Sequence, residues 1–264
     1  TLNIEGTNQN TKVQGVSIEF SSFSEQVGYL KVSDSVLENV FLFGPTGNAS
    51  YGSFDIEDST LNDISGMYLW YPSRDSSIER NVFQNFAGLS IGLSTSNLVI
   101  RNNVFLNQTS SFAIENWANY NDTLVVEYNS FLDADNIALA LRSDYSNTYI
   151  LATNNYFATT DSSVIETRIM DANDSLRYAS VIEFSPFLLQ PHSNTPELID
   201  TDADAAPNIT DNCPDLNNSD QLDTDGDSIG DACDYNVTSA VLDIDANGSF
   251  DALTDGLIIL RYAF

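Results

Sequence analysis

Aspartates at alternating positions are the residues of this chain whose type and spacing could do chemistry. They lie in residues 200–234 and offer the hard oxygen ligands, about six to eight, that Ca²⁺ prefers. A calcium loop of about twelve residues supplies these ligands from positions 1, 3, 5, 7, 9 and 12. An acidic solvated linker, the alternative, would not need Asp at alternating positions. Two windows carry the calcium spacing: Asp200, Asp202, Asp204, Ala206 (through its carbonyl), Asn208 and Asp211; then Asp223, Asp225, Asp227, Ile229 (carbonyl), Asp231 and Asp234.

A third window lies in residues 241–264, "VLDIDANGSFDALTDGLIILRYAF". Gly248 takes the tight-turn position 6, and the apolar run that follows the loop predicts a short helix. This stretch resembles one loop-helix unit of a type I dockerin, a family whose full module has a second such unit. The last carboxylate falls one residue after position 12. The candidate ligands are Asp243, Asp245, Asn247, Ser249 (carbonyl), Asp251 and Asp255.

The two cysteines, Cys213 and Cys233, each lie one or two residues from the last ligand of a loop. They are placed to link the first two loops. A bridge closing about 20 residues would contribute roughly 3 kcal/mol, mostly by restricting the unfolded chain. A zinc site would want more soft ligands than the chain offers, so we predict a disulfide.

The segment "DNCPDLNNSDQLDTDGDSIGDACD" resembles a thrombospondin type 3 repeat, with its Asn-Cys-Pro, Asp-Gln and Gly-Asp-Ala-Cys-Asp elements. The resemblance covers about residues 200–234, within a predicted unit of residues 200–236. Ala205 and Ser228 stand at loop position 6, where glycine is usual, and Ser219 replaces a common proline. The oxygen donors are all kept. The resemblance implies several calcium ions with a structural role.

Residues 1–190 contain an internal repeat of 22–28 residues. Each copy has an aliphatic residue, a Ser, Thr or Asn three later, and a Leu or Phe two after that. A second short apolar run, such as "SVIET", follows about ten residues on. Short β-rich runs at this period predict a β-solenoid. The clear copies are Val32–Ser35–Leu37, Ile56–Ser59–Leu61, Ile78–Asn81–Phe83, Ile100–Asn103–Phe105 and Val126–Asn129–Phe131. Ala152–Asn155–Phe157 is a weaker copy, and Ile4–Thr7–Gln9 is a degenerate first one.

The recurring Asn suits a turn, where left-handed backbone is tolerated and stacked amides can bond along the axis. The Phe would stack on its counterparts in the same layer. Coils of this length resemble right-handed parallel β-helices of the pectate-lyase-like type, and the crossover preference agrees. We therefore expect an all-β fold: a right-handed parallel β-helix over 1–190, a linker over 191–199, an irregular calcium-binding segment and a short C-terminal helix.

The solenoid offers a candidate glycan face, because sugar rings stack on aromatic side chains. The alternative is an ordinary solvated face with ion pairs between coils. Aligning the second strand of each coil predicts two outward columns, which are Trp70, Glu115 and Glu166, and, two positions on, Trp117, Arg142 and Arg168.

Catalysis is the less favoured interpretation, and we assign no catalytic residue. Pectate-lyase-like eliminases use Lys or Arg as base, yet Lys12 and Lys31 are the only lysines. The single histidine, His192, lies in "QPHSNTP", outside the coils, so no Ser-His-Asp set can be built within them. Glu115 and Glu166, the remaining carboxylate pair, fall two coils apart.

The overall charge of −29, from 38 acidic and 9 basic residues, argues against nucleic acid and anionic membranes as partners. No Lys or Arg occurs between Arg177 and Arg261, so the C-terminal carboxylates need cations or water between them. Hydrophobic residues make up 42%, enough for a real core. No stretch is apolar for long enough to insert into a membrane.

We expect a secreted or cell-surface bacterial module with structural calcium, acting in carbohydrate binding, adhesion or matrix structure. One alternative is the C-terminal part of a polysaccharide lyase or hydrolase whose active coils lie upstream. Another is a subunit of a self-assembling extracellular filament, built through the solenoid ends or the C-terminal unit. The chain begins within a repeat and without a signal-peptide pattern, so we interpret it as a mature or excised part of something longer.

Overall fold

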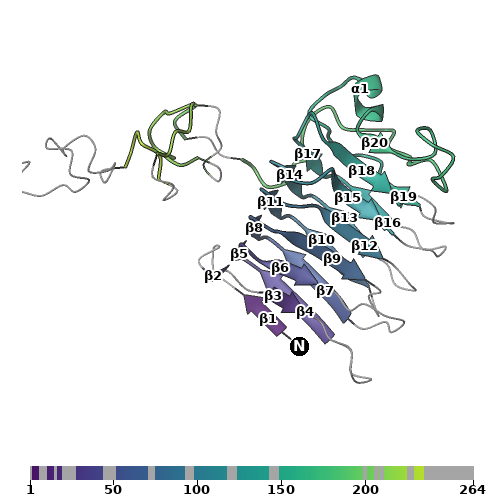
Figure 1. The fold of residues 1–264 in the computed structure, drawn as a ribbon, viewed down its shortest axis with the longest axis horizontal. Coiled ribbons are helices and arrows are strands. Elements are labelled where there is room, and N and C mark those ends of the chain that lie inside the picture. Colours follow the sequence, from purple (N-terminus) through teal and green to yellow (C-terminus); the bar gives the residue numbers. More distant parts are fainter. Residues whose placement is uncertain are drawn as a thin grey trace, which may run out of the picture. The chain divides into compact units, whose positions relative to one another are not determined.

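The computed structural model forms two compact units, Thr1–Pro196 and Glu197–Phe264 (Figure 1). We describe each unit by itself. The structure describes residues 2–5, 11–14, 17–19, 28–43, 52–70, 75–92, 98–117, 124–142, 149–198, 201–204, 208, 211–224 and 229–234.

The first unit is a parallel β-solenoid of three sheets, as the repeat predicts. All the pairs between named strands are parallel, and each joins one coil to the next. The first sheet contains β1 (Leu2–Glu5), β4 (Gly28–Ser33), β7 (Gly52–Glu57), β10 (Ser76–Glu79), β13 (Leu98–Arg101), β16 (Leu124–Glu127) and β19 (Ile150–Leu151). The second contains β2 (Thr11–Gln14), β5 (Ser35–Glu38), β8 (Thr60–Asn62), β11 (Val82–Gln84), β14 (Val104–Leu106) and β17 (Ser130–Phe131). The third contains β3 (Ser17–Glu19), β6 (Phe41–Phe43), β9 (Gly66–Trp70), β12 (Leu89–Gly92), β15 (Phe112–Asn116), β18 (Ile137–Leu141) and β20 (Ile169–Met170).

The register of the strands follows the repeat. Aliphatic residues of the first sheet pair from coil to coil, for example Ile78 with Ile100, and both are fully buried. The first copy is partly wrong. Ile4 does pair with Val32, but the partner of Leu37 is Val13. Gln9 was predicted there, and it lies outside the described residues.

Buried asparagines form a ladder inside one corner of the coils. The side-chain Oδ1 of Asn103 accepts the backbone N–H of Asn81, and its Nδ2 donates to the Ile78 carbonyl at 2.8 Å. Asn129 and Asn155 repeat these bonds one and two coils later. Each buried amide thereby satisfies backbone groups that would otherwise be orphaned. The predicted stacking of amides along the axis is confirmed.

The predicted left-handed backbone at these asparagines is wrong, because the preceding residue makes the turn. That residue has φ between 56° and 62° before the four asparagines, and φ of 47° and 50° before Ser35 and Ser59, which take the same place in earlier coils. The amide must point inward to reach its partners, so the turn falls on a neighbour with an outward side chain. These neighbours are Asp34, Asp58, Arg80, Asn102, Tyr128 and Asn154.

The phenylalanines that follow the ladder stack as predicted. Ring centroids lie 4.9 Å apart for Phe83 and Phe105 and 5.0 Å apart for Phe105 and Phe131. Phe157 continues the stack at 5.4 Å. These rings are almost completely buried and form the centre of the apolar core.

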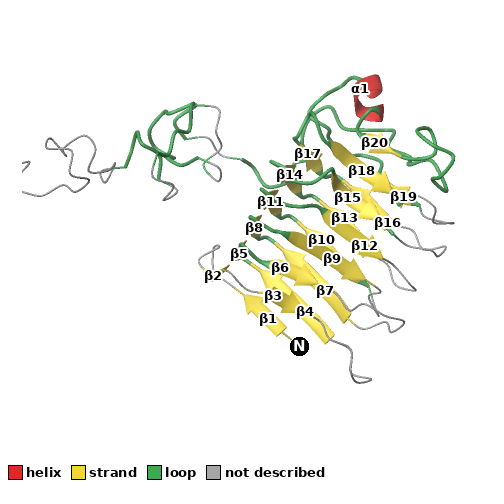
Figure 2. Cartoon of the chain, in the orientation of Figure 1, coloured by secondary structure: helices red, strands yellow, loops and turns green. Residues whose placement is uncertain are grey.

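A short helix, α1 (Ser162–Glu166), lies at the C-terminal end of the coils (Figure 2). The apolar run "SVIET" was predicted as a strand, so this prediction is wrong. Asp161 caps the helix by accepting the Ser163 N–H at 2.9 Å, and Ile165 packs into the core. A local cap favours a helical turn over an extended run here. No helix among the described residues is long and apolar enough to cross a membrane.

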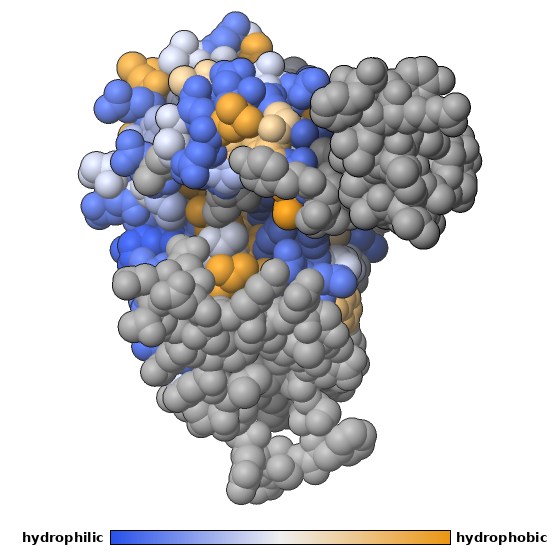
Figure 3. Space-filling model, turned by 90° about the vertical axis from the view of Figure 1, so that its left-hand side faces the viewer, coloured by the Kyte–Doolittle hydropathy of each residue, from blue (hydrophilic) through white to orange (hydrophobic). Residues whose placement is uncertain are grey.

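The first part of the predicted linker packs on the solenoid. The Nδ1 of His192 lies 2.8 Å from the Asn102 Nδ2, and its ring lies against Tyr128. The Thr195 hydroxyl donates to the Tyr128 carbonyl at 3.0 Å. The described surface in Figure 3 is mostly hydrophilic, with apolar residues in small separate patches.

Candidate calcium site and predicted glycan face

Three carboxylates of the first predicted calcium loop come together in the second unit. Asp202, Asp204 and Asp211 each offer an oxygen, and these oxygens all lie within 4.8 Å of one another. They occupy loop positions 3, 5 and 12. Because Ca–O distances are about 2.3–2.6 Å, oxygens bound to one ion lie up to roughly 5 Å apart. The three oxygens are therefore close enough to share one calcium ion.

Neighbouring groups donate hydrogen bonds to two of these carboxylates. The Oδ1 of Asp211 accepts the Cys213 N–H at 2.7 Å and the Gln221 amide at 3.0 Å. The Oδ2 of Asp204 accepts the Asn218 N–H at 2.9 Å. Asp204 and Asp211 are 6% and 8% exposed, so these bonds replace water that burial removes.

The second oxygen of Asp211 has no such replacement. The Oδ2 of Asp211 is buried without a hydrogen-bond partner. A buried charged oxygen that lacks a partner costs more than an ordinary lost hydrogen bond. A cation beside Asp202 and Asp204 would supply the missing interaction.

The charge balance of the second unit points the same way. Its sequence contains no Lys, and its one Arg is Arg261, far along the chain from the cluster. Two like charges 4 Å apart repel by about 1 kcal/mol in water and about 4 kcal/mol near a protein surface. Since no basic side chain lies in the described part of this unit, a bound cation is the available way to offset the repulsion.

The two loops share a second feature, a bond between positions 2 and 9. In the first loop, the Asn208 Oδ1 accepts the Thr201 N–H at 2.8 Å. In the second, the Asp231 Oδ1 accepts the Thr224 N–H at 2.8 Å, and its Oδ2 accepts the Thr224 hydroxyl. These bonds lower the pKa of Asp231. The same sequence spacing therefore folds the same way twice.

Position 9 is also joined to position 2 by these bonds, while its role as a calcium ligand stays a prediction. Asn208 donates to the Thr201 hydroxyl as well as accepting its N–H, so its amide closes the loop. In the second loop, Asp223 and Asp234 are half-buried, and Ile229 is 42% exposed. The remaining predicted ligands lie outside the described residues, namely Asp200, Ala206, Asp225, Asp227, Asp243, Asp245, Asn247, Ser249, Asp251 and Asp255.

The predicted disulfide between Cys213 and Cys233 is confirmed, with Cα atoms 5.6 Å apart. It joins the end of the first loop to the end of the second. Gly230 packs against it, and a Cβ there would lie 2.7 Å from the Cys213 Sγ and 2.2 Å from the Asn212 Oδ1. A larger residue at this position would push the two loops apart.

On the solenoid, the structure brings together part of the predicted glycan face. The guanidinium of Arg142 lies 3.9 Å from the centroid of the Trp117 ring and 3.6 Å from the Glu115 carboxylate. The Trp117 indole N–H donates to Glu115. Burial raises the pKa of Glu115, while the bond from Trp117 and the charge of Arg142 oppose the rise. These three side chains therefore form one interacting group on the solenoid.

None of the remaining members takes its predicted place in the two columns. Trp70 pairs with Gly92, and the partner of Glu115 in that strand is Ser90, so Trp70 falls outside the Glu115 column. The side chain of Trp70 lies outside the described residues. Glu166 is in α1, where it accepts from the Asn173 amide at 2.9 Å. The strand alignment was two residues off at Trp70 and failed where the apolar run became a helix.

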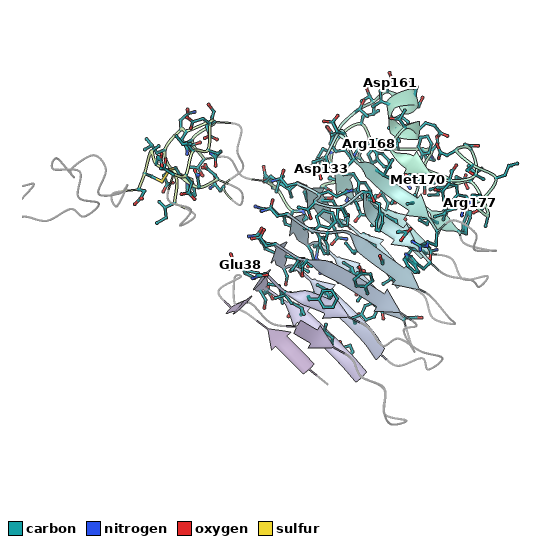
Figure 4. The ribbon with its side chains drawn as sticks, viewed as in Figure 1. Glu38, Asp133, Asp161, Arg168, Met170 and Arg177 are labelled. Atoms are coloured by element: carbon teal, nitrogen blue, oxygen red, sulfur yellow. A yellow bond between two sulfur atoms is a disulfide. The ribbon has the colours of Figure 1, made fainter. Side chains whose placement is uncertain are left out.

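Arg168 points into the end of the solenoid instead of outward (Figure 4). It is 3% exposed and donates to the carbonyls of Phe157 and Asn136, at 2.6 and 3.2 Å. Burial lowers its pKa, although Asp133 and Asp135 act in the other direction. Its role is to satisfy backbone carbonyls that no further coil pairs with.

Comparison with protein-family models, with curated proteins and with solved structures gave no match. The parallel solenoid and the disulfide therefore rest on this chain's own geometry. The resemblances to pectate-lyase-like, thrombospondin type 3 and dockerin families rest on motifs alone.

Proposed function

We propose that this chain is a calcium-binding extracellular module whose second unit is held together by bound calcium. The observation that carries the proposal is the buried Asp211 Oδ2, which has no hydrogen-bond partner beside Asp202 and Asp204. We assign the calcium a structural role, because the cluster would tie position 12 of the first loop, Asp211, to positions 3 and 5, Asp202 and Asp204.

Calcium fits the available donors better than other common metals. The cluster offers only carboxylate oxygens, and both cysteines are bound to each other, so no soft ligand is present for zinc. Magnesium demands a near-ideal octahedron and releases its water reluctantly, whereas calcium accepts irregular sets of carboxylates and carbonyls. An irregular loop with alternating aspartates suits calcium.

The disulfide supports a place outside the cell, because such bonds persist in oxidising compartments. Extracellular calcium modules bind in the range of about 0.1–1 mM, where the ion is plentiful. The solenoid would then be a stiff rod in adhesion or in a matrix, with coils of the right-handed sense that crossovers between parallel strands prefer. The thrombospondin type 3 and dockerin assignments belong to this proposal.

Calorimetric titration of the whole chain with calcium, after chelation and dialysis, tests the proposal. We expect binding at millimolar calcium or below. Asp211→Asn keeps the Oδ1 acceptor and removes the charge, so it should weaken the first site roughly tenfold or more. The matched control is Asp215→Asn, which removes an exposed carboxylate from the same unit and should bind like the wild type. The absence of any heat at millimolar calcium, or equal affinities for the two variants, would contradict the proposal.

A further inference from the structure

Gln221 lies at the centre of the side-chain network around the acidic cluster. Its Nε2 lies 3.2 Å from the Asp204 Oδ2 and 3.0 Å from the Asp211 Oδ1. The same NH₂ group lies 3.2 Å from the Asn218 carbonyl and 3.0 Å from the Asn218 Oδ1, so its two hydrogens are shared among these acceptors. It therefore lies between the carboxylates at positions 5 and 12 of the first loop. Gln221 is not a predicted ligand, and its backbone is left-handed with φ 49°.

The orientation of this amide is set by a neighbouring backbone group. The Asn212 N–H donates to the Gln221 Oε1 at 3.0 Å. Because an N–H needs an acceptor, the oxygen of the amide must face Asn212. The NH₂ end consequently faces Asp204 and Asp211, where a donor is wanted.

We propose that Gln221 is a positioning residue for the calcium site, holding Asp204 and Asp211 from their outer side so that their remaining oxygens converge on the ion. This inference rests on the proposed calcium site. The amide binds one oxygen of each carboxylate and leaves the buried Asp211 Oδ2 for the metal. Outer partners of this kind orient the ligands and strongly affect metal affinity.

A neutral donor at this position matches the charge of the cluster. An amide lowers the repulsion between two carboxylates without adding a charge of its own. Gln221 also keeps the loop arranged before the ion arrives, so less ordering is left for the binding step. Removing it should therefore weaken binding even though Gln221 never touches the metal.

The test compares Gln221→Met, which keeps the length but removes the amide, with Gln221→Ala, which adds no atom that could clash. Asn217→Ala is the control, because Asn217 is an exposed amide in the same segment. Calcium calorimetry should show the affinity of one site falling about 10–100-fold in both Gln221 variants, and unchanged affinity in the control. Terbium bound in place of calcium should carry more water molecules in the two Gln221 variants than in the wild type. Its luminescence lifetimes in H₂O and D₂O measure this number.

The outcomes separate this inference from the one beneath it. If the wild-type chain binds no calcium, the proposed function fails. If the wild type binds calcium and both Gln221 variants bind it with the wild-type affinity and the wild-type terbium hydration, only the role of Gln221 is overturned. Simultaneous loss of all calcium sites and of the disulfide in the variants would show that Gln221 maintains the fold, which also overturns a positioning role.

Discussion

The solenoid and the C-terminal unit treat buried polar side chains in opposite ways. In the solenoid, Asn103 is fully buried, yet its amide bonds to backbone and side-chain groups of both neighbouring coils. In the C-terminal unit, Asp211 is nearly as buried but keeps an oxygen without a partner. The first arrangement is complete within the chain. The second would be completed by the proposed calcium ion, so we expect the stability of the two units to depend differently on calcium.

Removing calcium should produce the largest difference between the units. Calcium at 100 times its dissociation constant stabilises a folded unit by about 2.7 kcal/mol per site. A chelator should therefore melt the C-terminal unit at a much lower temperature and leave the solenoid transition nearly unmoved. Differential scanning calorimetry with and without chelator measures both transitions. An equal shift of the two would show that the units do not differ in this way.

Asn103→Ala should destabilise the solenoid and leave the C-terminal unit unchanged. The change removes the acceptor of the Asn81 N–H and the donor to the Ile78 carbonyl, and leaves both groups buried. We expect a loss of about 3 kcal/mol or more in the free energy of unfolding of the solenoid. Denaturant unfolding measures the loss. The control is Thr109→Ala, at an exposed residue a little further along the chain, and it should leave the free energy of unfolding almost unchanged. Calcium affinity should stay the same in both.

Glu115→Gln should have the smallest effect on stability. It tests whether burying a carboxylate in the solenoid makes the stability of the solenoid depend on pH. The raised pKa of Glu115 means that the folded state favours its protonated form, so wild-type stability falls as the pH rises through that pKa. The glutamine variant should lack this fall, and therefore gain on the wild type at neutral pH and match it at acidic pH.

Denaturant unfolding at neutral and acidic pH measures this effect. Glu127→Gln, which removes a partly exposed carboxylate of the first sheet, provides the matched control. A variant that is less stable than the wild type at neutral pH would show instead that the charge of Glu115 stabilises the fold through Trp117 and Arg142.

The contacts in the interior of the solenoid were the part of the fold that the sequence repeat predicted best. Coils stack at a fixed spacing, so residues that repeat along the chain must become neighbours, as Phe83 and Phe105 do. The ends were harder. Gln9 was predicted where Val13 pairs, and Arg168 was predicted on the surface although it fills the end of the last coil. An end coil has a neighbour on one side only, so periodicity constrains it less.

In the proposed calcium loop, too, some features follow from local sequence and others only from the folded structure. The alternating aspartates and the cysteines are local patterns, and the sequence by itself determined the cluster of Asp202, Asp204 and Asp211 and the disulfide. Only the tertiary structure decided which carboxylate oxygen stays open and that Gln221 holds the others. Those facts depend on hydrogen bonds between residues of different loops, whose geometry exists only once the chain has folded.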